Sequence, residues 1–270
     1  LCYIYYSIVY ILGEKMKQKI YEIFIVLIIV FIFISAYNFY RNRENRENIE
    51  IETSTEPVVE NDIDEEHESK IQKPIDSNTT DWNLILVNKD NPIPEDYETE
   101  TIKIEEKWEV DVRVKEAIEQ MLSDARKAGL DPIICSAYRT SNYQKNLFNN
   151  KVKEYKRKGY SQKNAEEQAS LWVTIPGTSE HELGLSLDIV DRKYQILDEK
   201  QENTAVQKWL MEHCYEYGFI LRYPTDKKDI TKINYEPWHY RYVGVKDAMF
   251  IKERQFCLEE YIDFLKEYEE

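Results

Sequence analysis

The stretch TSEHELGLSLDIV, residues 178–190, combines an apolar run with side chains that commonly bind metal ions. The part from Leu185 to Val190 is almost entirely apolar, which predicts a buried strand. Asp188 lies inside that run, and an ionised carboxylate is costly to bury unless a cation compensates its charge. His181 precedes it by seven residues. This stretch therefore predicts a strand that carries a metal-binding carboxylate.

Two further stretches place charged or metal-binding residues beside a predicted strand: SAYRT at 136–140 and YEPWHYRYVG at 235–244. A catalytic zinc ion keeps three protein ligands and leaves its fourth position to water. His181, Asp188 and His239 supply that number. A lone histidine is more often structural, but the three residues together favour a zinc site.

Two other residues have the chemistry that hydrolysis at such a site needs. Glu236 lies three residues before His239, across a proline that restricts the backbone, so its carboxylate can act as a general base near the metal. The alternative is a surface glutamate at a strand start. Arg139 lies at the end of the predicted strand in PIICSAYR, residues 132–139, where a guanidinium can bind a carboxylate or stabilise an oxyanion. An ordinary ion pair is equally consistent with its position.

The chain beyond about residue 80 has the pattern of an α+β domain, which we expect to be a small antiparallel sheet flanked by helices around the zinc site. Apolar residues in the first long helix recur at helical spacing, and Gly129 follows as its C-cap. The pattern predicts helices over 111–128, 141–158, 161–172, 203–217 and 245–266, and strands over 82–87, 132–138, 185–190, 219–223 and 239–243.

The N-terminal region predicts a membrane anchor. Residues 20–40 are apolar almost throughout, and about 20 such residues span a bilayer. A cleaved signal peptide and a buried core helix are the alternatives. We expect residues 1–19 to form a cytoplasmic tail. Because Met16 is the first methionine, we also expect residues 1–15 to lie outside the natural protein, which N-terminal mass analysis would test.

Residues 41–80 form an acidic segment with twelve Asp and Glu against five Lys and Arg. Such a composition buries too little apolar surface to offset the entropy of ordering, so it predicts a disordered, flexible stalk before a catalytic domain over 81–270. The whole chain has a net charge of -15, which argues against nucleic acid as a partner because nucleic-acid binding needs clustered cations.

The remaining chemistry-bearing residues give weaker signals. The cysteines fit neither a metal knuckle nor a dense disulfide framework, so we interpret them as isolated thiols, although a Cys135–Cys214 disulfide stays open. We expect His213 to lie at the edge of the core and His67 to be solvated in the stalk. Asp191 is a candidate for a position behind the metal ligands.

The stretches SAYRTSNYQ, SEHELGLSLD and EPWHYRYVG closely resemble the signatures of VanY-type D-alanyl-D-alanine carboxypeptidases, a zinc peptidoglycan peptidase family with LD-carboxypeptidase relatives. WNLILVNKDNPIPEDY resembles the start of that domain, so the resemblance covers about 80–270. It implies one Zn²⁺ on His181, Asp188 and His239, base catalysis by Glu236, and contact of Arg139 with the substrate or the transition state.

The same matching places Gln144 and Ser179 in the substrate cleft. It also shows one departure, because this chain has Lys232 where the family pattern leads us to expect glycine before the last motif.

The resemblance implies hydrolysis of the terminal D-alanine from peptidoglycan stem peptides. An LD-carboxypeptidase acting on tetrapeptide stems is the close alternative, and a non-catalytic wall-binding module on the same fold is another. The presence of Glu236 argues against the module. Because the substrate lies in the cell wall, we expect a single-pass protein of the cell membrane with its catalytic domain outside the cytoplasm. The membrane and the stem peptide are the expected partners, with no obligate protein partner.

Overall fold

The computed structural model describes residues 76–269, so the predicted tail, the membrane span and most of the stalk lie outside the described residues. Within 76–269, no helix is both long and apolar enough to cross a bilayer. Ser77 is buried, and the Thr79 hydroxyl donates a hydrogen bond to Glu269 Oε2 at 2.7 Å. The folded domain therefore begins a few residues before the expected boundary at 81.

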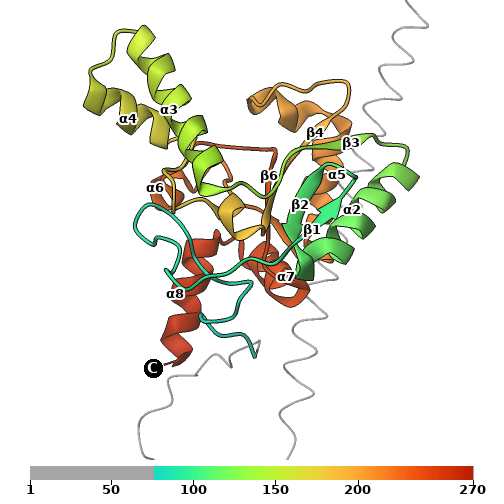
Figure 1. The fold of residues 1–270 in the computed structure, drawn as a ribbon. Coiled ribbons are helices and arrows are strands. Elements are labelled where there is room, and N and C mark those ends of the chain that lie inside the picture. Colours follow the sequence, from blue (N-terminus) through green and yellow to red (C-terminus); the bar gives the residue numbers. More distant parts are fainter. Residues whose placement is uncertain (1–75, 270) are drawn as a thin grey trace, which may run out of the picture. The chain divides into compact units, whose positions relative to one another are not determined.

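A four-stranded antiparallel sheet forms the centre of the domain, as the sequence predicts (Figure 1). Its strands are β3 (Pro132–Ser136), β4 (Ser186–Asp191), β5 (Phe219–Leu221) and β6 (His239–Tyr242), in the order β3-β4-β6-β5. Strand β6 thus pairs with β4, although the two lie about fifty residues apart along the chain. This pairing brings the stretches 178–190 and 235–244 side by side.

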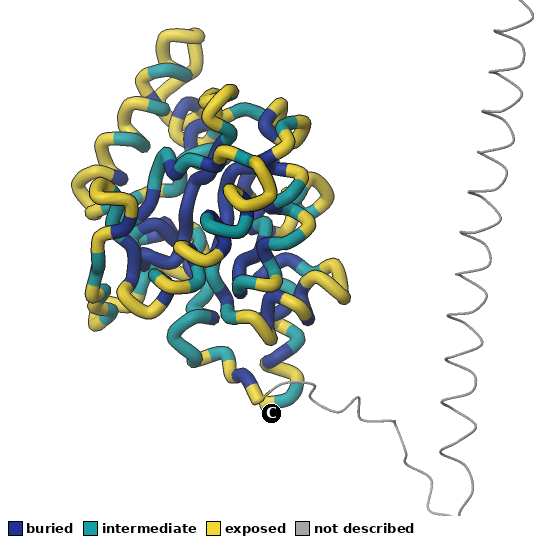
Figure 2. Tube along the Cα trace, turned by 90° about the vertical axis from the view of Figure 1, so that its right-hand side faces the viewer, coloured by how far each residue is buried: buried dark blue, intermediate teal, exposed yellow. Residues whose placement is uncertain are grey.

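Helices pack around this sheet and fill most of the predicted ranges. They are α2 (Lys115–Lys127), α3 (Ser141–Arg157), α4 (Gln162–Ser170), α5 (Ala205–His213), α6 (Lys228–Thr231), α7 (Val245–Arg254) and α8 (Leu258–Glu269). The apolar face of α2 is buried and joins the sheet and α5 in the main core. Helices α3 and α4 pack on each other and project from the rest of the domain (Figure 1). Figure 2 shows the buried positions gathered at the domain centre.

The predicted strand over 82–87 is wrong. This segment runs as a turn followed by an extended chain outside any sheet, yet Leu84 and Val87 are fully buried. Its backbone groups are satisfied by a side chain instead of a neighbouring strand, because the carbonyls of Asn83 and Ile85 both accept hydrogen bonds from Arg241 at 3.0 Å. The buried Arg241 side chain thus supplies hydrogen bonds that a neighbouring strand would otherwise have supplied.

A two-stranded hairpin, made of β1 (Thr101–Ile104) and β2 (Trp108–Asp111), is present that the sequence pattern did not predict. Hairpin turns need positive φ angles, which Gly or Asn usually supply. Here Glu105 and Glu106 adopt φ angles of 46° and 61°, so the usual turn signal is absent from the sequence.

The long helix predicted over 245–266 is two helices, α7 and α8. The chain breaks at Gln255, whose φ of 56° is left-handed, and the Cys257 N–H then donates a hydrogen bond to the Glu260 carboxylate at the start of α8. The predicted helix over 203–217 likewise ends in a separate 3₁₀ turn at Cys214–Tyr217. Cys214 and Cys135 are both free thiols, so the disulfide that the sequence left open is not formed.

We expect Gly218→Ala to destabilise the domain far more than Gly129→Ala. Both glycines have a φ of 82°, where a side chain costs about 1–2 kcal/mol. A Cβ at Gly129 would meet open space, whereas one at Gly218 would lie 2.8 Å from the Tyr242 ring and 3.0 Å from the Val245 nitrogen. Crowding should add about 1–3 kcal/mol at Gly218. Equilibrium urea unfolding measures both variants, and equal losses would contradict the packing argument.

Candidate metal and catalytic site

The strand register places two of the predicted ligands directly opposite each other. Asp188 on β4 pairs with His239 on β6, so their side chains emerge on the same face of the sheet. His181 lies in the 3₁₀ turn Glu180–Leu183 that precedes β4. Gly184 ends this turn at a φ of 73°, and a Cβ there would lie 2.8 Å from the Asp111 nitrogen. Glycine therefore allows the chain to turn from His181 into β4.

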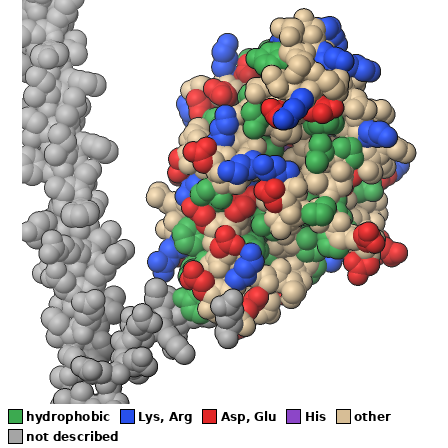
Figure 3. Space-filling view, turned by 90° about the vertical axis from the view of Figure 1, so that its left-hand side faces the viewer, with side chains coloured by type: hydrophobic (Ala, Val, Ile, Leu, Met, Phe, Trp, Pro, Cys, Tyr) green, Lys and Arg blue, Asp and Glu red, His purple; other side chains and the backbone are tan. Residues whose placement is uncertain are grey.

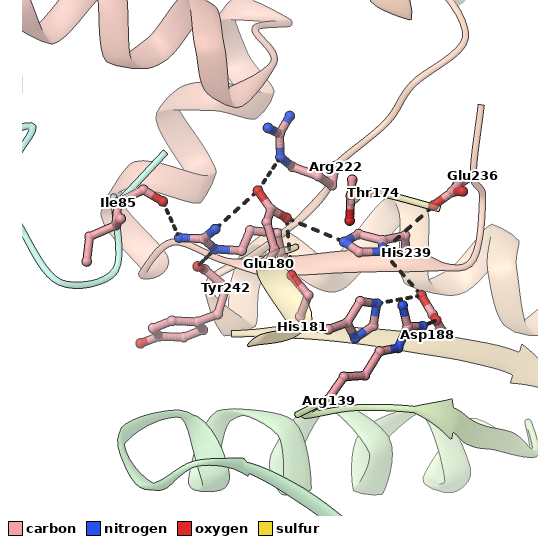
Figure 4. Close-up of polar contacts among 12 residues, drawn as sticks. Ile85, Arg139, Thr174, Glu180, His181, Asp188, Arg222, Glu236, His239 and Tyr242 are labelled. Carbon is pink, nitrogen blue, oxygen red and sulfur yellow. Dashed lines mark hydrogen bonds and ion pairs between the residues drawn. The ribbon is translucent and has the colours of Figure 1, made fainter. Parts of the chain in front are cut away.

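The three side chains converge on one point (Figure 4). Asp188 Oδ1 lies 3.2 Å from His239 Nδ1 and 3.4 Å from His181 Nε2, and the ligand atoms all lie within 4.8 Å of one another. The two imidazole rings stand nearly perpendicular, with centroids 4.9 Å apart. These donors surround one position that a metal ion could occupy.

The hydrogen bonds behind the ligands fit a zinc ion. The carbonyl of Ala137 lies 2.8 Å from His181 Nδ1, which therefore carries the ring hydrogen and leaves Nε2 to bind metal. Neither His181 Nε2 nor Asp188 Oδ1 has a hydrogen-bond partner among the described residues, although both atoms are buried. Two histidines and one carboxylate are a common donor set for catalytic zinc. The unsatisfied atoms and the donor types both fit that ion.

The two histidines differ in protonation. Burial lowers the pKa of His181 to about 4, with Arg139 adding to the effect, so this imidazole is neutral. Burial acts in the same direction on His239, but the carboxylates of Asp188 and Glu180 outweigh it and raise the pKa of that imidazole to about 9. A metal ion that binds near neutral pH must therefore displace a proton from His239.

Arg139 contacts the ligand set directly. Its Nη2 donates a hydrogen bond to Asp188 Oδ2 at 2.6 Å, and its Nε donates to Ser136 Oγ at 2.8 Å. Burial alone would raise the pKa of Asp188, but His181 and Arg139 hold it well below its usual range. The guanidinium is 14% exposed and lines the cavity in front of the ligands. Arg139 thus keeps Asp188 ionised and also faces the space where a substrate would lie.

The two other predicted substrate residues lie at different depths. Ser179 is on the wall of the same cavity. Gln144 is fully buried, and its amide donates a hydrogen bond to the Thr174 carbonyl at 2.7 Å while its oxygen lies 3.4 Å from Arg139 Nη1. Gln144 is therefore not one of the residues that line the cavity, and it contacts Arg139 instead.

Glu236 lies on the cavity wall beside the ligands. The cavity has a volume of about 220 Å³, and aromatic residues including Tyr223 and Trp238 form part of its lining. Glu236 Oε2 is 3.8 Å from His239 Nδ1, and the His239 N–H donates a hydrogen bond to the Glu236 carbonyl at 3.1 Å, which closes the turn between them. Burial raises the pKa of Glu236 to about 8. This carboxylate is close to the metal position without belonging to the ligand group.

A buried charge network lies behind the ligands, and the sequence pattern did not predict it. Glu180 is 1% exposed, and its Oε1 accepts a hydrogen bond from Arg222 Nε at 2.7 Å. Arg241 Nη1 lies 3.1 Å from the same oxygen, a charge contact without hydrogen-bond geometry. Glu180 Oε2 lies 3.4 Å from His239 Nε2. One sequence signal pointed to this network: residues two apart on a strand share a face, so Arg241 lies on the same face of β6 as His239.

Asp191 does not take the position behind the ligands for which it was a candidate. Its carboxylate accepts a hydrogen bond from the Lys193 N–H at 2.8 Å instead, and Glu180 occupies the place behind His239. His213 lies half-buried at the domain edge and pairs with Glu216 at 3.0 Å, as expected for a boundary histidine.

Comparison with known proteins finds one family along this part of the chain. The family model described as VanY, D-alanyl-D-alanine carboxypeptidase, matches residues 107–245. A D-alanyl-D-alanine carboxypeptidase of Enterococcus faecalis is 44% identical over 184 residues, which cover 68% of this chain and 66% of that protein. The chain thus matches slightly less than two thirds of that relative's length.

Solved structures show the same likeness. VanYB in complex with D-alanine-D-alanine is 43% identical with a TM-score of 0.63, covering 68% of this chain and 98% of that one. A variant of the vancomycin resistance D,D-pentapeptidase VanY in complex with Zn(II) is 43% identical with a TM-score of 0.62, covering 67% and 99%. The LdcB LD-carboxypeptidase is 36% identical with a TM-score of 0.55, covering 67% and 86%.

We expect Glu180→Gln to unfold at lower denaturant and to bind zinc more weakly, because it leaves Arg222 and Arg241 without their shared counter-charge. Removing one partner from a buried ion pair costs about 3–5 kcal/mol, and loss of a group behind a ligand weakens metal binding about 10–100-fold. Glu182→Gln is the control, since the half-buried Glu182 carboxylate accepts a hydrogen bond from the Gly177 N–H and has no arginine partner in this network. Urea unfolding and zinc titration measure both, and equal effects would contradict the network's role.

Proposed function

Since this chain belongs to the VanY family of D-alanyl-D-alanine carboxypeptidases, we propose that it removes the terminal D-alanine from peptidoglycan stem peptides. It is a zinc metallocarboxypeptidase with one zinc ion per chain. The observation that carries this function is the buried group of His181, Asp188 and His239 with Glu236 beside it in one cavity.

Glu236 is the general base of the proposed reaction. Zinc bound by the three ligands supplies Lewis acidity, which polarises a carbonyl and lowers the pKa of water. The pKa of Glu236, about 8 without a metal charge, falls when a cation is bound nearby, so the group is a carboxylate at neutral pH. Glu236 then takes a proton from the attacking water and delivers it to the leaving amine of D-alanine.

Arg139 and the aromatic walls prepare the cavity for that step. The guanidinium faces the cavity and can neutralise negative charge on either the scissile carbonyl oxygen or the terminal carboxylate. Trp172, Tyr223 and Trp238 bring apolar surface to the lining, which lowers the local dielectric and strengthens these charge interactions. The cavity is small, as suits a bond between two alanines.

A DD-carboxypeptidase is favoured over an LD-carboxypeptidase and over a non-catalytic module. VanYB binds D-alanine-D-alanine in a structure 43% identical to this chain, which supports a D-alanyl-D-alanine terminus as the substrate. A non-catalytic module would not require Glu236. Burial raises the pKa of this group to about 8, so its ionised form is costly to keep beside the ligands. The cost of keeping that group there is consistent with catalysis.

We further propose that residues 20–40 anchor the chain in the cell membrane and that residues 41–75 connect the anchor to a catalytic domain outside the cytoplasm. The apolar run, the acidic composition of the connecting segment and the location of peptidoglycan support this arrangement. The stem peptide and the membrane are then the only partners that the proposal requires.

We expect Glu236→Ala to keep zinc and lose activity. The ligand group stays complete, while loss of a general base lowers the rate about 10²–10⁴-fold. Mass spectrometry of D-alanine release from a stem pentapeptide, with zinc content measured in parallel, checks this. Release from a tetrapeptide but not from the pentapeptide would replace the DD assignment with an LD one. Full activity of the variant would remove Glu236 from the mechanism.

We expect the full-length chain to remain with the membrane fraction after a salt wash, and a chain lacking residues 1–40 to be released. A span of about 20 apolar residues binds the bilayer by burial, which salt does not weaken. Immunoblotting of fractions measures the distribution, and protease added to intact cells lacking their wall should cleave the catalytic domain. Recovery of the full-length chain in the soluble fraction would contradict the anchor.

A further inference from the structure

A second cavity of about 390 Å³ adjoins the catalytic one. The two cavities share Thr174, Tyr223 and Ile233 as lining residues. The smaller cavity holds the metal ligands and Glu236, and the larger contains none of them. A ligand that extends beyond the scissile bond can therefore continue from the first cavity into the second across these shared residues.

The second cavity has an apolar floor and a charged rim. Tyr223 and Ile233 are buried at its base. The charged lining residues are exposed and carry both signs: Lys89, Lys232, Glu166 and Glu167. Figure 3, which faces the side that carries α3 and α4, shows Lys or Arg and Asp or Glu side chains interspersed with hydrophobic ones. An apolar chain that ends in both a positive and a negative group complements such a cavity.

Lys232 is the residue by which this chain departs from the expected glycine. It follows α6 at a φ of 61°, a left-handed conformation that glycine adopts freely and that costs other residues about 1–2 kcal/mol. Its side chain lies on the rim of the second cavity. Its ammonium donates a hydrogen bond to the Asp229 carbonyl of α6, which holds the cation at this edge of the cavity, where it can meet a negative group of a ligand.

We propose that the second cavity binds the side chain of the third stem residue, and that Lys232 and Lys89 select a side chain ending in both an ammonium and a carboxylate, as in diaminopimelate, over lysine. This assignment rests on the proposed function, which places the two terminal alanines in the catalytic cavity and the third residue at its exit. The aliphatic part of the side chain packs on Tyr223 and Ile233. Glu166 and Glu167 face its ammonium, and the lysines face its carboxylate.

The experiment compares the full-length zinc enzyme on three pentapeptides that differ only in the third residue: diaminopimelate, lysine, and diaminopimelate with its side-chain carboxylate amidated. We expect kcat/KM for the first to exceed the other two about fivefold, mainly through KM, as partly exposed ion pairs allow. In Lys232→Gly, which suits the backbone conformation, the ratio of kcat/KM for the diaminopimelate peptide to kcat/KM for the lysine peptide should fall toward one, with the larger change on the diaminopimelate peptide. Lys228→Ala, on α6 outside the cavity, is the control and should keep the preference.

Equal cleavage of all three peptides by the unaltered enzyme overturns the assignment and leaves the carboxypeptidase function intact. An unchanged preference in Lys232→Gly likewise overturns the role of this lysine. Cleavage of none of the peptides, with zinc bound stoichiometrically, overturns the proposed function and with it the assignment.

Discussion

The buried carboxylate of Glu180 is the interaction on which both the fold and the site depend. A charge in the protein interior is tolerated only when it is paired and hydrogen-bonded. The Glu180 Oε1 atom pairs with Arg222 and Arg241, and its Oε2 atom faces His239 Nε2. Arg222 in turn makes two hydrogen bonds of 2.7 Å to Glu259 on α8. The C-terminal helix is thus connected to a metal ligand through three buried charges.

The same network explains why one sheet can hold both a core and a metal site. On β6, the side chain of Arg241 reaches the backbone of the 83–85 segment and ties it to the domain. His239, two residues earlier on the same face, points its Nδ1 toward Asp188. Since alternate residues of a strand share a face, one side of β6 carries both the structural cation and the ligand. Loss of the network would therefore disturb the ligands and the packing together.

The three residues predicted as metal ligands could be picked out from the sequence, and the fold brings them together, because their signal is chemical. A carboxylate within an apolar strand and a histidine on another strand have few explanations other than a cation. The sequence predicted helix α2 and the central sheet because their apolar periodicity matches their burial. It failed for the 82–87 segment, where an arginine satisfies the backbone, and for the hairpin whose turn residues are Glu105 and Glu106. In the first case the deciding contact comes from a residue far along the chain, and in the second the turn residues are uncommon ones, so the local sequence carried no signal for either.

Tyr223 shows how the two cavities can act together. Its ring packs on His239 with centroids 4.8 Å apart and lies 4.9 Å from the Arg222 guanidinium, and it lines both cavities. A side chain that fills the second cavity would press on the ring that supports a metal ligand. Binding energy from a part of the substrate far from the scissile bond then contributes to orienting the reacting groups, with the larger part of the effect on KM. The shared aromatic wall makes substrate selection and ligand geometry parts of one structural unit.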